Sequence, residues 1–133
     1  METNQRHIAF FLTALNCGGA EQVFIRLANY LARKGHTIDI LVVKREGVLI
    51  DSIEADVGLV ELGGKGVLSS FLPLIRYLKL QRPAWLVSAL SGPNVIAILG
   101  QHTLRFFSHY RGKLAVSQHN TLSEKVYCAR TLR

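Results

Sequence analysis

Apolar and polar residues alternate along this chain in blocks that predict strands followed by helices. The first block, residues 7–15, is an almost unbroken apolar run, typical of a strand buried on both faces of a parallel sheet. In the next block, residues 20–34, apolar side chains recur every three or four positions, which predicts an amphipathic helix. Lys34 and Gly35 supply the C-terminal end expected of that helix.

The same alternation continues to residue 117. Further strands are predicted at residues 37–43, 57–62, 84–90 and 113–117 from their β-branched and apolar content. One helix is predicted from Ser69 or Ser70, as its cap, to Pro83, and another from Asn94 to Phe107. Alternating strands and helices favour a doubly wound, Rossmann-like α/β fold with a parallel sheet covered on both faces.

The final residues, 121–133, also have a helical pattern, but neither a glycine nor a proline follows to end the helix. Because this stop signal is absent, we expect one domain over residues 1–133 that is truncated at its carboxyl end.

Two consecutive glycines, Gly18 and Gly19, lie between the first predicted strand and the helix after it. Glycine has no Cβ and tolerates positive φ, so main-chain amides there are open to a ligand. The positive end of the helix dipole favours an anion at such a position, and open α/β folds bind ligands at this edge of the sheet. Two interpretations stay open: a phosphate-binding turn, or a tight connection that glycine merely permits.

Composition adds a strong positive charge. Sixteen Lys and Arg against nine Asp and Glu give a net charge of +7, which favours phosphates or an anionic membrane surface as partners. The charges are spread without a dense run, so a solvated surface with a surplus of one sign explains them equally well. We expect no nucleic-acid partner.

Cysteine usage and the N-terminus indicate a cytoplasmic protein. Cys17 and Cys128 have neither a C-x-x-C partner nor a histidine at metal-ligand spacing, so we expect free thiols and no metal. Glu2 offsets Arg6 before the short apolar run, which argues against an export signal. The charge-free stretch 83–104 is broken by a turn, which argues against a membrane span.

An oxidoreductase that transfers a hydride fits the glycine motif of this chain less well. A nicotinamide-binding fold needs a third glycine and an acidic residue at the end of the second strand. Here the third glycine is absent, Asp39 lies in the middle of that strand, and Lys44 and Arg45 follow it. An NADP-type oxidoreductase fragment that uses these two cations for the 2′-phosphate stays open as an alternative. A non-catalytic nucleotide- or partner-binding module is a second one.

Several short segments carry a more specific signal. They are Gly18-Gly19-Ala20-Glu21, Leu27-Ala28-Asn29-Tyr30-Leu31, Lys34-Gly35-His36, Arg82-Pro83, Ser91-Gly92-Pro93-Asn94-Val95 and Val116-Ser117-Gln118-His119-Asn120. In these segments the chain resembles the amino-terminal domain of family-4-type glycosyltransferases of the GT-B fold. The resemblance covers nearly the whole chain.

That resemblance implies transfer of a hexosyl unit from a nucleotide-diphosphate sugar to a saccharide or lipid-linked acceptor, with retention and without a cofactor. It implies that Gly18 and Gly19 face the donor diphosphate and that His119 is the catalytic residue near the reacting sugar. Asn94 and Asn120 are expected as weaker acceptor or donor contacts. Simpler roles stay open, because His119 and Asn94 are also placed to cap helices.

Relatives in that family bind the nucleotide sugar chiefly through a second α/β domain. These 133 residues contain no such domain. Leaving-group stabilisation needs charge focused from both walls of a closed cleft. We therefore expect the acceptor-side half alone to be inactive, and to lie in the cytoplasm or peripherally at the inner face of the cell membrane.

Overall fold

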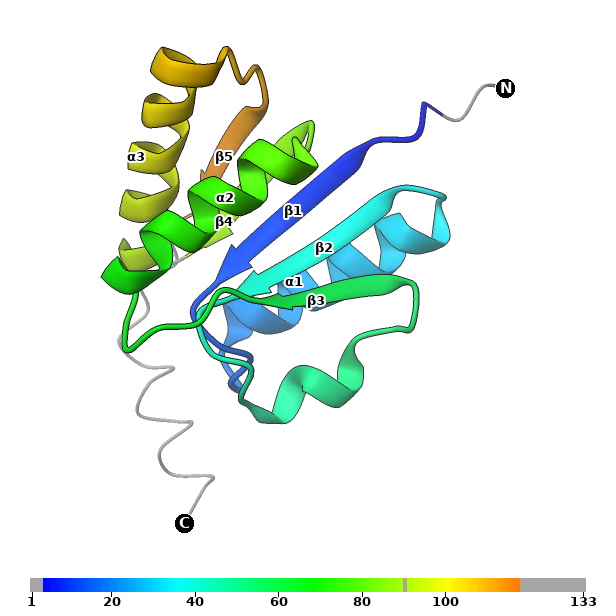
Figure 1. The fold of residues 1–133 in the computed structure, drawn as a ribbon. Helices are drawn as coiled ribbons and strands as arrows, with labels where there is room; N and C mark the ends of the chain where they lie inside the picture. The colour runs from blue at the N-terminus through cyan, green and yellow to red at the C-terminus, as the bar shows by residue number, and fades with distance from the viewer. Residues whose placement is uncertain (1–3, 90, 118–133) are drawn as a thin grey trace.

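The computed structural model describes residues 4–89 and 91–117. Five parallel strands form one sheet in the order β3-β2-β1-β4-β5, with helices on both faces (Figure 1). The strands are β1 (His7–Leu12), β2 (Thr37–Val42), β3 (Val57–Glu61), β4 (Trp85–Ala89) and β5 (Lys113–Ser117). This arrangement confirms the predicted doubly wound, Rossmann-like α/β fold.

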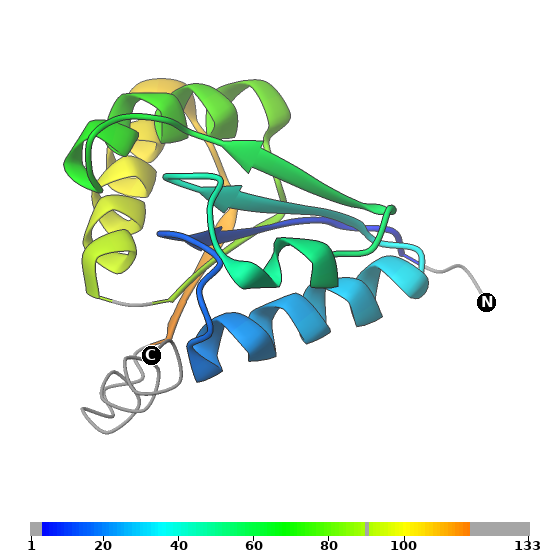
Figure 2. The same cartoon turned by 90° about the horizontal axis from the view of Figure 1, so that it is seen from below.

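The helices divide between the two faces of the sheet. They are α1 (Gly19–Arg33), α2 (Phe71–Gln81) and α3 (Ser91–Ser108), with the short 3₁₀ turns η1 (Val48–Ser52) and η2 (Leu68–Ser70). Figure 2 shows α1 and η1 on one face and α2 and α3 on the other. The strand order runs outward from β1 in two directions, so crossovers of a single hand place the two halves on opposite faces.

The central strand explains the apolar run with which the chain begins. On β1, Phe10 and Leu12 pack in the core beneath α1, whereas Ala9 and Phe11 pack in the core beneath α2 and α3. All four are at most 1% exposed. Because successive side chains point to opposite faces, a strand covered on both sides must be apolar at every position.

Some element ends differ from the predictions. Ser70 is the N-cap residue of α2, as one of the two predicted positions, but its side chain makes no cap bond and its Oγ donates to the carbonyl of Val67 instead. Ser69 Oγ donates to the carbonyl of Gly66 at 2.7 Å. The first strand ends at Leu12, three residues before the apolar run does, and beyond it the carbonyl of Thr13 accepts hydrogen bonds from the amides of Val43 and Lys44. The helical pattern of residues 121–133 lies outside the described residues.

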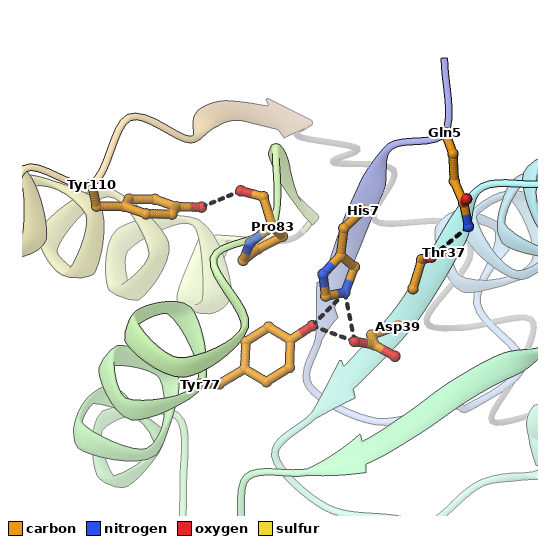
Figure 3. A network of polar contacts seen from close by, with 7 residues as sticks. All are labelled: Gln5, His7, Thr37, Asp39, Tyr77, Pro83 and Tyr110. Atoms are coloured by element: carbon orange, nitrogen blue, oxygen red, sulfur yellow. Dashed lines mark hydrogen bonds and ion pairs between the residues drawn. The ribbon is translucent and has the colours of Figure 1, made fainter. Parts of the chain in front are cut away.

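A polar network joins β1, β2 and α2 (Figure 3). Nε2 of His7 lies 2.8 Å from Oδ2 of Asp39, and the hydroxyl of Tyr77 donates to the same oxygen. Burial and the carboxylate of Asp39 raise the pKa of Tyr77 above its usual range. Asp39 is the third residue of β2, which confirms that the strand does not end on this carboxylate.

Candidate functional site

The strand order reverses between β1 and β4, which makes the carboxyl ends of these two strands the switch point of the sheet. Open α/β folds bind ligands in the crevice outside such a point. Here the segment after β1, residues 13–18, and the first turn of α3 lie at this edge. We take this edge as the candidate functional site.

Backbone hydrogen bonds hold the segment after β1 in place. The amide of Leu15 donates to the carbonyl of Glu46 at 3.0 Å, and the amide of Leu49 donates to the carbonyl of Leu15 at 3.0 Å. Between them, Gly47 has φ 122°, and a Cβ added there would lie 2.0 Å from the Leu15 oxygen. A glycine is therefore required at position 47 for the chain after β2 to support the candidate site.

The paired glycines stand at the start of α1. Gly18 is the N-cap with φ −64° and ψ 149°, and Gly19 is the first helical residue. Any residue can adopt this backbone conformation, so the main-chain geometry at Gly18 does not itself require a glycine. What the glycine provides is space at the start of α1, where a side chain at position 18 would otherwise lie.

A carboxylate lies in that space. A Cβ at Gly18 would lie 2.1 Å from Oε2 of Glu21, so the Glu21 side chain folds back over the glycine. A negative charge in the first turn is favourable at the positive end of the helix dipole. A phosphate bound at Gly18 would have to displace this carboxylate or be repelled by it.

Asn94 lies in the first turn of α3 and is 9% exposed. Its Nδ2 atom donates to the carbonyl of Ser117, the last residue of β5, at 3.0 Å. The helix begins at Ser91, so Asn94 is inside it and the capping alternative is wrong. The residue instead ties the start of α3 to the end of β5.

Two buried side-chain oxygens in the described part of the chain lack a hydrogen-bond partner. They are Oγ of Ser88, on β4, and Oδ1 of Asn94. Buried polar atoms without partners are uncommon in folded proteins because each costs about 1–3 kcal/mol. Both belong to elements that meet at the switch point, so this edge retains unused hydrogen-bonding capacity.

Two predicted site residues, His119 and Asn120, lie outside the described residues. They follow Ser117, with which β5 ends at the candidate edge.

Lys44 and Arg45 are exposed just after β2. The expectation of a free Cys17 thiol is wrong, because this residue is disulfide-bonded. Cys17 therefore does not support the inference of a reducing compartment.

Residues 4–89 and 91–117 contain neither a metal-ligand cluster nor a membrane-spanning helix. No group of three or more His, Cys, Asp or Glu residues there is arranged to hold a metal ion. Over the same residues, no helix combines the length and the apolar character needed to cross a membrane.

Sequence reasoning missed three features of this molecule. The position of Gly47 follows from its contact with Leu15, 32 residues earlier, which no local pattern reveals. The Glu21 carboxylate lies over Gly18, three residues earlier, and this spacing at the start of a helix was a local signal for it. The bond from Asn94 to Ser117 joins residues 23 positions apart. A glycine directly after the charged Lys44-Arg45-Glu46 run was the one available signal for the first of these.

The strand order and the glycine turn at its switch point define a Rossmann-like domain. No protein-family model and no curated protein sequence matches the chain. Among solved structures, it is similar to a glycosyltransferase from Rickettsia africae ESF-5, with a TM-score of 0.66 and 20% identity over 93% of this chain and 33% of that chain. It is also similar to CalG4, the calicheamicin glycosyltransferase, with a TM-score of 0.54 and 16% identity over 97% of this chain and 36% of that one.

These similarities show a fold like that of glycosyltransferases. The chain spans about a third of the length of the two solved enzymes.

Proposed function

We propose that residues 1–133 are the amino-terminal, acceptor-side domain of a GT-B glycosyltransferase of the family-4 type. The observation that carries the proposal is the fold similarity to two glycosyltransferases, each matched over about a third of its length. The glycine turn at the switch point supports it, because this is where an open α/β domain binds a ligand.

In the proposed reaction, a hydroxyl oxygen of a saccharide or lipid-linked acceptor forms a bond to the anomeric carbon of a hexose, with retention. The bond from that carbon to the diphosphate oxygen breaks, and the nucleoside diphosphate leaves with the bonding electrons. The proton of the acceptor hydroxyl passes to the diphosphate oxygen that leaves. No metal or other cofactor takes part in this proposal.

Gly18 and Gly19 have the donor-phosphate role in this proposal. The start of α1 carries the positive end of the helix dipole, which stabilises negative charge that develops on the leaving diphosphate. The Glu21 side chain must change its rotamer for this contact to form, because its carboxylate lies over Gly18.

His119 has the catalytic role, with Asn94 and Asn120 as weaker contacts to acceptor or donor. A neutral imidazole both donates and accepts a hydrogen bond, so His119 is suited to hold the donor sugar or to orient the acceptor hydroxyl. The unpartnered Oδ1 atom of Asn94 supports a contact with a sugar hydroxyl. A second domain would supply the opposite wall of the cleft.

The net charge of +7 supports a peripheral contact with an anionic membrane at the inner face of the cell membrane. We place the protein in the cytoplasm on this proposal. Binding to anionic vesicles that disappears at high salt would support the contact, whereas salt-insensitive binding would count against it.

The test uses the product of the whole reading frame that contains these residues, assayed with a panel of nucleotide-diphosphate hexoses. Gly18→Leu should lower kcat/KM by about tenfold or more, because removing transition-state stabilisation of about 1.4 kcal/mol has this effect. Gly66→Leu is the matched control, since nothing lies within 4 Å of a Cβ at Gly66. Unchanged turnover by Gly18→Leu would overturn the donor-phosphate role.

A second variant tests the carboxylate over the turn. Glu21→Gln should tighten binding of the nucleoside diphosphate by about two- to fivefold, because a like charge at a partly exposed site is removed. Asp56→Asn, which removes an exposed charge elsewhere, should leave that affinity unchanged. Product stereochemistry, read from the anomeric proton coupling, decides whether the transfer proceeds with retention.

A further inference from the structure

A cavity of about 720 Å³ opens at the amino edge of the sheet, at the opposite end of the strands from the glycine turn. Its walls come from the starts of β1, β4 and β5 and from the residues that follow α2 and α3. This volume lies within the range of small-ligand sites. Nothing in the proposed transfer reaction uses this cavity.

The lining of the cavity is cationic. Arg6, Arg82, Arg111 and Lys113 contribute four exposed positive charges, and none of the lining residues is acidic. The two ion pairs among the described residues join His7 to Asp39 and Arg33 to Glu54, so these four cations have no acidic partner there. The sequence from residue 62 to residue 123 contains no Asp or Glu at all.

Two of the basic residues that line this cavity have a strained backbone conformation. Arg82, with φ 47°, and His109, with φ 52°, are the non-glycine residues with positive φ in the described part of the chain. They follow α2 and α3, where glycine would adopt the left-handed conformation at lower cost. Both residues line the cavity, so each of them combines a strained backbone with a basic side chain at this site.

Fixed contacts build the cavity walls. The hydroxyl of Tyr110 donates to the carbonyl of Pro83 at 2.7 Å (Figure 3), and Gln101 donates to the carbonyl of Gly112. A Cβ at Gly112 would lie 2.0 Å from the Tyr110 hydroxyl, so glycine is required where the chain passes this ring. Burial raises the pKa of Tyr110 to about 12, opposed by the nearby charge of Arg82.

We propose that this cavity binds a phosphate group, carried by a soluble phosphate compound or by a lipid headgroup. Three of its four cations are arginines, whose planar guanidinium groups donate paired hydrogen bonds to phosphate oxygens. Because the site is concave, it fits a small anionic ligand better than it fits the flat surface of a protein partner. The site is independent of the proposed transfer, because it lies at the other edge of the sheet.

Two phenylalanines distinguish the two sources. Phe106 and Phe107 are 82% and 76% exposed and precede His109 at the end of α3. Exposed aromatic residues beside basic ones enter the boundary between headgroups and acyl chains. A lipid phosphate would therefore use both the cavity and this aromatic pair, whereas a soluble phosphate would use the cavity alone.

The experiment measures two probes against the 133-residue chain: inorganic pyrophosphate by titration calorimetry, and phosphatidylcholine vesicles with or without phosphatidylglycerol by co-sedimentation. The double variant Arg111→Ala with Lys113→Ala should weaken binding of the active probe about tenfold or more, since hydrogen bonds to charged groups are lost. Arg76→Ala with Lys79→Ala is the matched control, because it removes two exposed charges from α2 outside the cavity.

A selective loss in the first double variant supports the site. If pyrophosphate is the active probe, the source is soluble. If only the anionic vesicles bind, and Phe106→Ser with Phe107→Ser also weakens that binding, the source is a lipid headgroup. The proposal is overturned if neither probe binds, if the two double variants lose affinity equally, or if neither loses any. Pyrophosphate held at the glycine turn would give this last result.

Discussion

The side-chain amide of Asn94 reaches the carbonyl of Ser117 across 3.0 Å and so joins the first turn of α3 to the last residue of β5. The other half of the same amide, Oδ1, is buried without a partner. Asn94 therefore has two roles: its Nδ2 atom stabilises the packing of α3 against β5, and its Oδ1 atom leaves an unused hydrogen-bond acceptor at the candidate site.

Asn94→Ala should lower the free energy of unfolding by about 1 kcal/mol, the usual net value of one hydrogen bond. The loss is not larger because the variant also removes the unsatisfied Oδ1 atom. Urea unfolding followed by circular dichroism measures the change. Asn16→Ala is the control, since Asn16 is exposed and should shift stability by less than about 0.5 kcal/mol. Equal effects of the two substitutions would contradict the role given to Asn94.

Asn29→Ala should cost more, about 2–3 kcal/mol, because two main-chain groups lose their partners at once. Nδ2 of Asn29 donates to the carbonyl of Ser52 at 2.8 Å, and its Oδ1 accepts from the amide of Glu54 at 3.1 Å. The residue is only 9% exposed and ties α1 to the chain between η1 and β3. In the same urea titration, the free energy of unfolding should be lower for Asn29→Ala than for Asn94→Ala. The reverse order would show that the second contact of Asn29 contributes nothing.

Gly47→Ala should destabilise the domain by more than about 3 kcal/mol, since φ 122° with ψ 158° is accessible essentially to glycine alone. The added methyl would also collide with the Leu15 carbonyl, which is main chain and cannot move aside independently. Thermal unfolding measures the effect, with Gly66→Ala as the unstrained control. A mild effect at Gly47 would mean that the segment after β1 adapts easily.

Stability should fall above about pH 10. The pKa of Tyr110 is raised to about 12 by burial, and that of Tyr77 is raised by burial and Asp39, from an ordinary value of 10.0. Below pH 10 both phenols are neutral in the folded and unfolded chains. Above pH 10 the tyrosines ionise in the unfolded chain before they ionise in the folded one. The free energy of unfolding therefore falls by up to about 1.4 kcal/mol per pH unit for each tyrosine.

Urea midpoints between pH 8 and pH 11 measure this slope. Tyr77→Phe should reduce the slope, whereas Tyr30→Phe, at a residue 53% exposed, should not. A slope that is the same in all three proteins would contradict the burial of the Tyr77 hydroxyl as the cause.

The alternation of buried strands and amphipathic helices could be predicted because each signal lies within a few neighbouring residues. Residues 8–12 of β1 are apolar at every position since the strand is covered on both faces. The position of Gly18 and Gly19 between strand and helix was predicted for the same reason. The N-cap position of α2 was predicted as Ser69 or Ser70, and it is Ser70. The hydroxyls of both serines donate to carbonyls of the preceding loop and not to the helix, a choice that the local sequence does not make.

Sequence by itself determined the parallel α/β class, the strand that begins at His7 and the glycines that open α1, because hydrophobic period and glycine placement are local properties. Tertiary structure alone decided that His7, Asp39 and Tyr77 meet, that Gly47 supports Leu15, and that four cations surround one cavity. These residues lie far apart along the chain and come together only when the strand order is fixed. Their contacts depend on packing between elements, which no single segment encodes.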